Sequence, residues 1–272
     1  MPSYPYFEIH SFAEPDRPFT GNPAGVCLME AFPAREVLAG IAASNNLSET
    51  AFLVPHGEEE DCWSLRWFTR TIEVDLCGHA TFAAGAVLLA GGSVRGDRAK
   101  FDTKSGRLAV KRAETGYAMD LPQIGCRPGQ ASAALEAALG IETAPVEVHD
   151  IERLHRAGYQ MWVMADEADV QLAQPDHSQL RRLDTNVILT APGRECDFVS
   201  RFFAPASGVD EDPVTGSAHC TLAPYWAERL GKTRLSARQI GPRPGALEVE
   251  PRHGRVTLYG HAPVYLEGSI SV

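Results

Sequence analysis

Four stretches of the chain place polar side chains where the surrounding pattern favours apolar ones. They read FTGNPAGV at 19–26, SNNLSETAF at 44–52, EVDLCGHAT at 73–81 and GVDEDPVTGSAHC at 208–220. In the second stretch Glu49 lies between a predicted helix and the predicted strand TAFLV. A partly desolvated carboxylate at the start of a strand could take a proton from carbon and return it, as a general base and acid. The alternative is a solvated loop glutamate, so its role depends on its neighbours.

Two glycines stand directly before side chains that could act with this carboxylate. Gly78 and Gly216 each open a predicted Ala-rich helix and are followed by His79 and Ser217. The first N–H groups of a helix are unpaired and carry partial positive charge, so they can hold a substrate carboxylate without a basic side chain. His79 could donate a hydrogen bond or relay a proton, and Ser217 could anchor a substrate oxygen. The alternative is that the glycines only permit a tight turn and close packing.

The acidic run before the second glycine has a structural and a chemical interpretation. Asp212 begins DPVTG, in which the proline fixes the turn, and an acid there can cap the following helix. In a site, the same carboxylate could hold a substrate amine or hydroxyl, or orient His79. We expect the neighbouring Asp210 and Glu211 to be solvated.

Cofactor chemistry finds no support in the sequence. Residue types that bind zinc occur at Cys77, His79, His219 and Cys220, but their spacings differ from those of structural zinc sites. The chain has no GxSxG elbow, no GxGxxG motif after a strand and no P-loop. We therefore predict that no metal and no organic cofactor is bound.

The elements that must position these residues occur twice in the same order. The first half has strand-like runs at 24–29, 50–54 and 63–69, helical patterns near 34–44 and 78–90, and the strand-like runs RLAVKR and YAMDL. The second half matches them at 159–165, 177–183, 186–192, 197–203, 216–231 and in GALEVEPRHGRVTLYG. Matched residues keep a nearly constant offset, which is 136 for Ala51 and Val187 and 138 for the two glycines. We infer two copies of one mixed α/β unit, at 1–125 and 126–272, with the active site in the cleft between them. Two unrelated segments with the same order of elements are the alternative.

The overall composition excludes some classes of protein. With 272 residues, 44% of them hydrophobic, the chain can bury a sizeable core. A formal net charge of −10 opposes binding to nucleic-acid phosphates, and the longest apolar stretch is about half of the roughly 20 residues that a membrane helix needs. Six scattered cysteines are typical of free thiols in a reducing compartment. We expect a cytoplasmic protein with no nucleic-acid or membrane partner.

The four polar stretches together resemble the PhzF family, the phenazine-biosynthesis-like isomerases, which have a diaminopimelate-epimerase-like fold. FTGNPAGV, NLSETAF, DLCGHAT and EDPVTGSAH occur in this order, so the resemblance covers the whole chain. It implies an α/β (α+β) fold of two similar units, each a curved, mostly antiparallel sheet around a central helix, with the site between them. Family members are commonly dimeric, so the resemblance also suggests a homodimer.

The resemblance further implies a reaction and the residues that perform it. In the phenazine member of the family, a dihydro-hydroxyanthranilate is isomerised by a proton shift without metal or organic cofactor. The catalytic carboxylate of the NLSET motif corresponds to Glu49, and the histidine of GHAT to His79. The aspartate and serine of DPVTGSA correspond to Asp212 and Ser217. The GNPAGV loop implies that Asn22 is a neighbour of the site.

The sequence therefore predicts an isomerase that performs a cofactor-free proton shift on a small, cyclic, acidic metabolite, with Glu49 as general acid and base. The cysteine in CGHAT is not expected in the dedicated phenazine enzymes, so the reaction class carries over better than the substrate. One alternative is an amino-acid racemase or epimerase of the same fold, which needs a thiol before each glycine, whereas Cys77 is matched by Thr215. Another is a non-catalytic protein that binds a metabolite.

Overall fold

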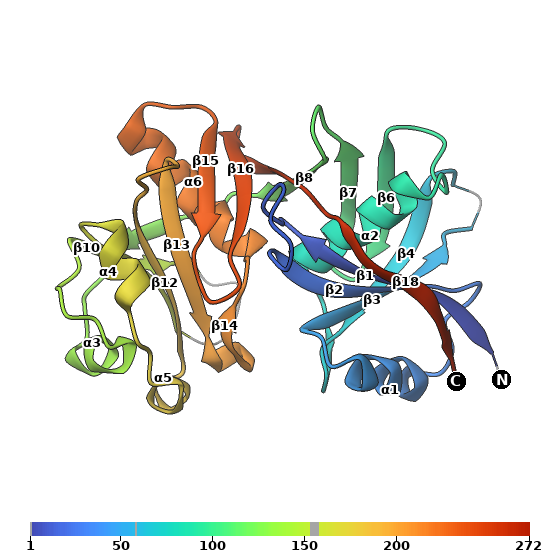
Figure 1. Ribbon diagram of the computed structural model, residues 1–272, viewed down its shortest axis with the longest axis horizontal. Helices are drawn as coiled ribbons and strands as arrows, with labels where there is room; N and C mark the ends of the chain where they lie inside the picture. The colour runs from blue at the N-terminus through green and yellow to red at the C-terminus, as the bar shows by residue number, and fades with distance from the viewer. Residues whose placement is uncertain (1, 58, 153–157) are drawn as a thin grey trace. The chain divides into compact units, whose positions relative to one another are not determined.

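The chain folds into two compact units, each built on a mixed β-sheet (Figure 1). The first unit comprises Met1–Asp120 and Tyr259–Val272, and the second comprises Leu121–Leu258. This is a computed structural model that describes residues 2–57, 59–152 and 158–272.

In its described residues the first unit has two helices and a sheet that contains both parallel and antiparallel strand pairs. Its elements in chain order are β1 (Ser3–Ser11), β2 (Asn22–Leu28), α1 (Arg35–Asn45), β3 (Glu49–Pro55), β4 (Cys62–Phe68), β5 (Glu73–Val74), α2 (Gly78–Ala90), β6 (Arg98–Thr103), β7 (Gly106–Arg112), β8 (Tyr117–Pro122) and, from the end of the chain, β18 (Val264–Ser271). β2 and β3 are parallel and are joined through α1, and β4 and β6 are parallel and are joined through α2. The pairs β3–β4, β4–β5, β6–β7 and β7–β8 are antiparallel.

The second unit repeats this arrangement. Its elements are β9 (Cys126–Pro128), α3 (Ala133–Leu139), β10 (Glu147–Ile151), β11 (Gly158–Val163), α4 (Glu167–Leu172), α5 (His177–Leu183), β12 (Thr185–Pro192), β13 (Phe198–Ala204), the short 3-10 helix η1 (Pro205–Ser207), β14 (Val209–Asp212), α6 (Gly216–Leu230), β15 (Leu235–Gln239), β16 (Gly245–Arg252) and β17 (Arg255–Gly260). β11 and β12 are parallel, as are β13 and β15, while β12–β13, β13–β14 and β15–β16 are antiparallel. The same strand pairs therefore form in both copies, which confirms the duplicated fold.

The helix α2 is the centre of the first unit. It packs against β1, β2, β3, β6 and β7, and every residue from His79 to Leu89 is buried. The run GHATFAAGAVLLA carries no Asp, Glu, Lys or Arg, as is typical of a helix that is covered on all sides. Gly85 allows the close approach of the sheet, because a Cβ atom there would lie 2.3 Å from Cβ of Val110. The small side chains thus fix how deeply α2 lies among the strands.

The boundary of the units differs from the expected division into 1–125 and 126–272. The compact units divide after Asp120, and the C-terminal residues 259–272 belong to the first unit. There β18 is antiparallel to β1, and in the second unit β9 takes the same place beside β10. Strand pairing across nearly the whole length of the chain has no signature in the local pattern, so the sequence could not locate β18.

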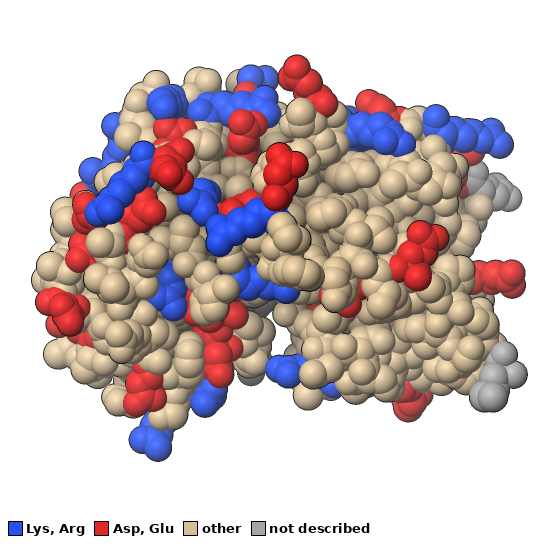
Figure 2. All heavy atoms as spheres, in the orientation of Figure 1, with Lys and Arg blue, Asp and Glu red and all other residues tan. Residues whose placement is uncertain are grey.

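The described surface carries charges of both signs. On the face seen in Figure 2, acidic and basic side chains lie interspersed, and no continuous basic patch is visible among the described residues of that face. No helix in the described part of the chain has both the length and the apolar character that crossing a bilayer requires.

Candidate active site

Glu49 lies at the first position of β3, directly after the turn that follows α1. The side-chain amide of Asn45, the last residue of α1, donates a hydrogen bond to the hydroxyl of Thr50 (3.2 Å). This bond ties the end of the helix to the start of the strand. Ala24 pairs with Glu49 across the parallel strands β2 and β3. Asn22, the first residue of β2 and fully buried, therefore lies at the same edge of the sheet.

His79 lies in the first turn of α2. Cys77 precedes the helix in an extended conformation, and Gly78 is the first helical residue. Two hydroxyl groups hold this segment in place. Ser11, on β1, donates to the carbonyl of His79 (2.8 Å), and Thr81 donates to the carbonyl of Cys77 (2.6 Å). The side chain of Cys77 does not cap the helix, as suits a helix start that binds an anionic ligand.

The side chains of Glu49 and His79 meet at this edge of the first unit. Oε2 of Glu49 lies 3.3 Å from Nε2 of His79, and the two side chains are 15% and 8% exposed. Burial lowers the pKa of His79 to about 4, because a charged imidazole would lose its hydration there. The ring is therefore neutral near neutral pH. The two atoms do not form a hydrogen bond, and among the described residues Nε2 has no hydrogen-bond partner. A ligand that bonds to this nitrogen is therefore favoured.

Cys77 adds a thiol to the same cluster. Its Sγ lies 3.6 Å from Nδ1 of His79, so the two nitrogens of one ring lie next to different groups. One oxygen of Glu49, Sγ of Cys77 and one imidazole nitrogen all lie within 4.8 Å of one another. The spacing of zinc-ligand types in the sequence did not indicate this cluster, because Glu49 is remote from the other two residues along the chain. Its chemistry suits proton transfer and also suits a divalent cation.

The second unit holds the remaining predicted residues around the start of α6. The hydroxyl of Thr215 donates to the carboxylate of Asp212. The side chain of Gln239 accepts from the backbone N–H of Thr215 (2.9 Å) and donates to the carbonyl of Asp212. Asp212 thus stabilises the turn before the helix, while Thr215 occupies the N-cap position. Ser217 lies half-buried in the first turn, after the buried Gly216.

Each unit carries a bidentate arginine–glutamate pair beside the turn that precedes its helix. Arg66 binds both oxygens of Glu73 (2.8 and 2.9 Å), and Arg201 binds both oxygens of Glu211 (2.7 and 2.9 Å). The glutamates belong to β5 and β14, the short strands before α2 and α6. The expectation that Glu211 is solvated is wrong, because its side chain is 12% exposed and its partner's is 8% exposed. Asp210 is exposed, and its carboxylate pairs with an arginine of α5.

Sequence reasoning missed several of the side chains that hold the site. Ser11 and Gln239 are buried polar residues on strands remote from the four motifs, and a single such residue has no recognisable pattern. Arg66 and Arg201 could have been found, because they occupy matched positions of the repeat at an offset of 135 and each is followed by two aromatic residues.

The predicted residues form two groups, one in each unit. The first group contains Asn22, Glu49, Gly78 and His79, and the second contains Asp212, Gly216 and Ser217. Within the first group, Glu49 and His79 are in contact, and Gly78 directly precedes the histidine in α2.

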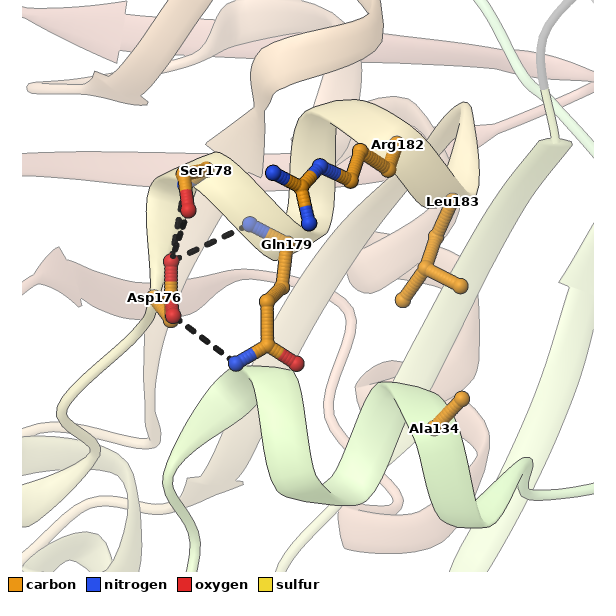
Figure 3. A pocket seen from close by; sticks show the side chains of 6 residues that line it. All are labelled: Ala134, Asp176, Ser178, Gln179, Arg182 and Leu183. Carbon is orange, nitrogen blue, oxygen red and sulfur yellow. Dashed lines mark hydrogen bonds between the residues drawn. The ribbon is translucent and has the colours of Figure 1, made fainter.

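A surface pocket in the second unit contains none of these residues (Figure 3). It is lined by Ala134, Asp176, Ser178, Gln179, Arg182 and Leu183. The carboxylate of Asp176 accepts hydrogen bonds from the backbone N–H groups of Ser178 and Gln179 and so caps α5. This helix cap accounts for the polar groups of Asp176, Ser178 and Gln179, and we assign no function to the pocket.

Known proteins resemble the chain over its whole length. The sequence model of the family described as phenazine biosynthesis-like protein matches residues 9–268. An uncharacterised isomerase of Pseudomonas aeruginosa is 46% identical over 265 residues, covering 97% of each chain. A phenazine biosynthesis-like domain-containing protein of Homo sapiens is 35% identical and covers 94% of this chain and 95% of its own.

Solved structures agree with this similarity. A PhzF family protein of Enterococcus faecalis superposes with a TM-score of 0.90 at 42% identity and covers all of both chains. A hydroxyproline epimerase of Agrobacterium vitis superposes with a TM-score of 0.61 at 9% identity, covering 98% of this chain and 92% of its own. The second likeness extends to the fold alone.

Proposed function

Because this chain belongs to the phenazine biosynthesis-like protein family, which includes relatives named isomerases, we propose that it is an isomerase that moves a proton within a small, cyclic, acidic metabolite. The reaction uses no metal and no organic cofactor. Glu49 is the general base and acid, and His79 is its partner.

The contact between Glu49 and His79 is the observation that carries this proposal. A carboxylate oxygen lies 3.3 Å from a buried imidazole nitrogen that has no hydrogen-bond partner in the part of the chain that the structure describes. At the repeat offsets of 136 and 138, the matched residues in the second unit are Thr185 and Ser217, and neither titrates near neutral pH. The duplicated fold therefore forms without a carboxylate–imidazole pair at this turn. A pair that the architecture does not require favours a chemical role.

The proposed reaction is a balanced transfer of one proton. The Glu49 carboxylate takes a proton from a substrate carbon, the electron pair left behind delocalises into the adjacent unsaturated system, and the carboxylic acid returns the proton to another carbon. The neutral His79 donates one ring N–H to the substrate oxygen on which negative charge develops. A neutral imidazole suits this role, because its N–H can donate a hydrogen bond to the negatively charged oxygen without giving up the proton.

Substrate binding is assigned to the two helix starts and the polar residues beside them. Gly78 and Gly216 leave backbone N–H groups for a carboxylate, Ser217 binds a substrate oxygen, and Asn22 contributes its amide. Asp212 binds a substrate amine or hydroxyl or orients a neighbouring group. Together these assignments describe an acidic substrate that also carries polar substituents. The protein binds it either as a monomer or as a homodimer in which each chain has its own site.

An amino-acid racemase or epimerase of the same fold remains the alternative enzyme. That mechanism needs a thiol on each face of the substrate, and the residue matched to Cys77 is Thr215, whose hydroxyl is far too weak an acid to replace a thiol. Activity of Cys77→Ala should stay within roughly tenfold of wild type, which corresponds to a barrier change of about 1.4 kcal/mol. Thr215→Val tests the matched position. A Cys77→Ala protein as inactive as Glu49→Gln would favour the thiol mechanism.

A protein that only binds a metabolite is the other alternative. Glu49 opposes it, because a carboxylate at the site of an acidic ligand weakens binding by charge repulsion. Such a residue benefits a catalyst and not a receptor for acids.

The decisive experiment screens cyclic hydroxy and amino acids with chelator-treated protein and follows them by NMR. The proposal predicts a product of unchanged mass in which a hydrogen or a double bond has moved. Inversion of a single stereocentre, lost in Cys77→Ala, would assign the protein to the racemases. Saturable binding with no turnover of any bound compound would favour the receptor.

A further inference from the structure

We propose that Glu49, His79 and Cys77 also form a binding site for Zn²⁺, and that occupation of this site switches the enzyme off. The binding claim stands on the geometry of the three side chains. The inhibition claim rests on the proposed function, because it requires Glu49 to be the group that moves the proton.

The distances suit a tetrahedral ion. Zinc binds imidazole nitrogen at about 2.0–2.1 Å and carboxylate oxygen at about 2.0–2.2 Å, so two such ligands of one tetrahedron lie about 3.4 Å apart. Nε2 of His79 and Oε2 of Glu49 are 3.3 Å apart. Sγ of Cys77 belongs to the same cluster, whose three ligand atoms lie within 4.8 Å of one another, but it lies 3.6 Å from Nδ1, the other nitrogen of the ring. A rotation about the Cα–Cβ bond of Cys77 that turns the sulfur towards the ion therefore has to accompany binding, and it completes a third ligand.

The surroundings of His79 favour binding of an ion by its Nε2. His79 is 6% exposed, and no other described residue forms a hydrogen bond with its buried Nε2. Ser11 and Thr81 hold the backbone carbonyls of His79 and Cys77 through hydroxyl hydrogen bonds. Ligands whose backbone is fixed in this way lose little freedom when a metal binds, because the site is already organised. The fourth position of the ion stays open to water.

Coordination and catalysis exclude each other. When Zn²⁺ enters, the Cys77 thiol releases its proton to solvent and its sulfur binds the ion, while an oxygen of Glu49 and a ring nitrogen of His79 donate lone pairs to it. No electron is transferred. The oxygen of Glu49 that binds the cation can no longer take a proton from carbon, and the ring nitrogen of His79 can no longer bind the substrate.

The repeat supplies an internal comparison. The residues matched to Glu49 and Cys77 are Thr185 and Thr215, and the residue matched to His79 is a serine. Hydroxyl groups are poor zinc ligands beside carboxylate, imidazole and thiolate. Among the described residues this cluster therefore occurs in the first unit and not at the matched positions of the second, and the expected stoichiometry is one ion.

The test titrates the full, chelator-stripped chain with Co²⁺ and then with Zn²⁺ as a competitor. Wild type should bind one Co²⁺ and show a thiolate-to-cobalt charge-transfer absorption that Zn²⁺ abolishes. Cys77→Ala should lose this absorption and bind Zn²⁺ at least ~100-fold more weakly, since even the loss of an outer-shell partner typically costs 10–100-fold. Cys77→Ser provides a second variant of nearly the same size, and thermal melts verify that both are folded.

A thiol in the second unit provides the matched control. Cys126 is more accessible than Cys77, so Cys126→Ala would lower zinc affinity if binding were adventitious, and should leave it unchanged if the site is as proposed. Unchanged affinity in Cys77→Ala, or the absence of the charge-transfer absorption in wild type, would overturn the site.

The zinc claim and the proton-shift claim fail in different ways. Metal-free protein that is inactive towards every compound of the metabolite panel would reject the proposed function and leave the cobalt titration unaffected. Protein that is active with chelator and inhibited by stoichiometric Zn²⁺ supports both claims. Stimulation by Zn²⁺ would overturn the inhibition claim, because the ion would then assist the reaction.

Discussion

Replacing Glu49 by glutamine removes the titratable group beside His79 while keeping the shape of the side chain. The change deletes the proton acceptor and keeps an amide oxygen that can still accept a hydrogen bond. Since the wild-type side chain is only 15% exposed, a substitution that preserves its volume leaves the packing around it intact. The variant therefore separates loss of chemistry from loss of structure.

The magnitude follows from the role assigned to Glu49. Loss of a general acid or base typically lowers the rate by about 10²–10⁴-fold, which raises the barrier by roughly 2.7–5.4 kcal/mol. The free energy of unfolding should change by less than about 1.5 kcal/mol, the usual size of one neutral hydrogen bond. Two quantities are measured for wild type and for the variant. They are kcat on the panel compound that wild type converts and the midpoint of urea unfolding.

Glu8 offers a control of nearly the same geometry in the same unit. Its Oε1 lies 3.2 Å from Nε2 of His10, and the two side chains are 18% and 6% exposed. Glu8→Gln should keep wild-type turnover within about threefold, because Glu8 and His10 both lie on β1 and are not part of the cluster of Glu49, His79 and Cys77. Equal losses of activity in Glu8→Gln and Glu49→Gln, or full turnover by Glu49→Gln, would refute the reasoning.

Three further predictions concern stability. Gly85→Ala should destabilise the fold by about 1–3 kcal/mol through overpacking. Gly40→Ala is the control, because a Cβ atom there meets nothing within 4 Å, and it should be neutral or stabilise the fold by up to about 1 kcal/mol. Urea unfolding that finds Gly85→Ala the more stable of the two would contradict the packing of α2. Glu211→Gln should cost about 3 kcal/mol, since it leaves the buried Arg201 charge without its carboxylate, and a loss below about 1 kcal/mol would refute that. Burial lowers the pKa of His219 to about 4, and that of His79 equally, so the unfolded chain takes up these protons first and stability falls by about 2 kcal/mol for each ring between about pH 7 and pH 5. Constant or rising stability over that range would contradict a neutral, buried ring.

Local pattern predicted much of the fold. The Ala-rich run from Gly78 gives α2 at its observed bounds, and the heptapeptide at 177–183 gives α5. Both are short-range signals, because the period of apolar residues and the opening glycine lie within one element. The predicted strands at 24–29 and 50–54 differ from β2 and β3 by two residues or fewer.

Long-range pairing is what the sequence could not provide. β1 contains Pro5 and has an irregular burial pattern, and β18 is exposed along most of its length, so neither shows the alternation that predicts a strand. Their pairing is determined by the rest of the sheet. The contact of Glu49 with His79 has the same character, since the two residues belong to a strand and a helix that only the folded unit brings together. The motifs named both residues, and only the structure gives their distance.

The origin of the transferred proton tests the central claim most directly. The chelator-treated protein, without added metal or nicotinamide, is incubated in D₂O with the panel compound that it converts, and the product is analysed by NMR and mass spectrometry. Proton transfer through Glu49 predicts deuterium at the single carbon that receives the proton, at a level set by exchange of the carboxylic acid with solvent, and no incorporation with Glu49→Gln. Product that forms equally fast with Glu49→Gln, or only after a metal or nicotinamide is supplied, would contradict it.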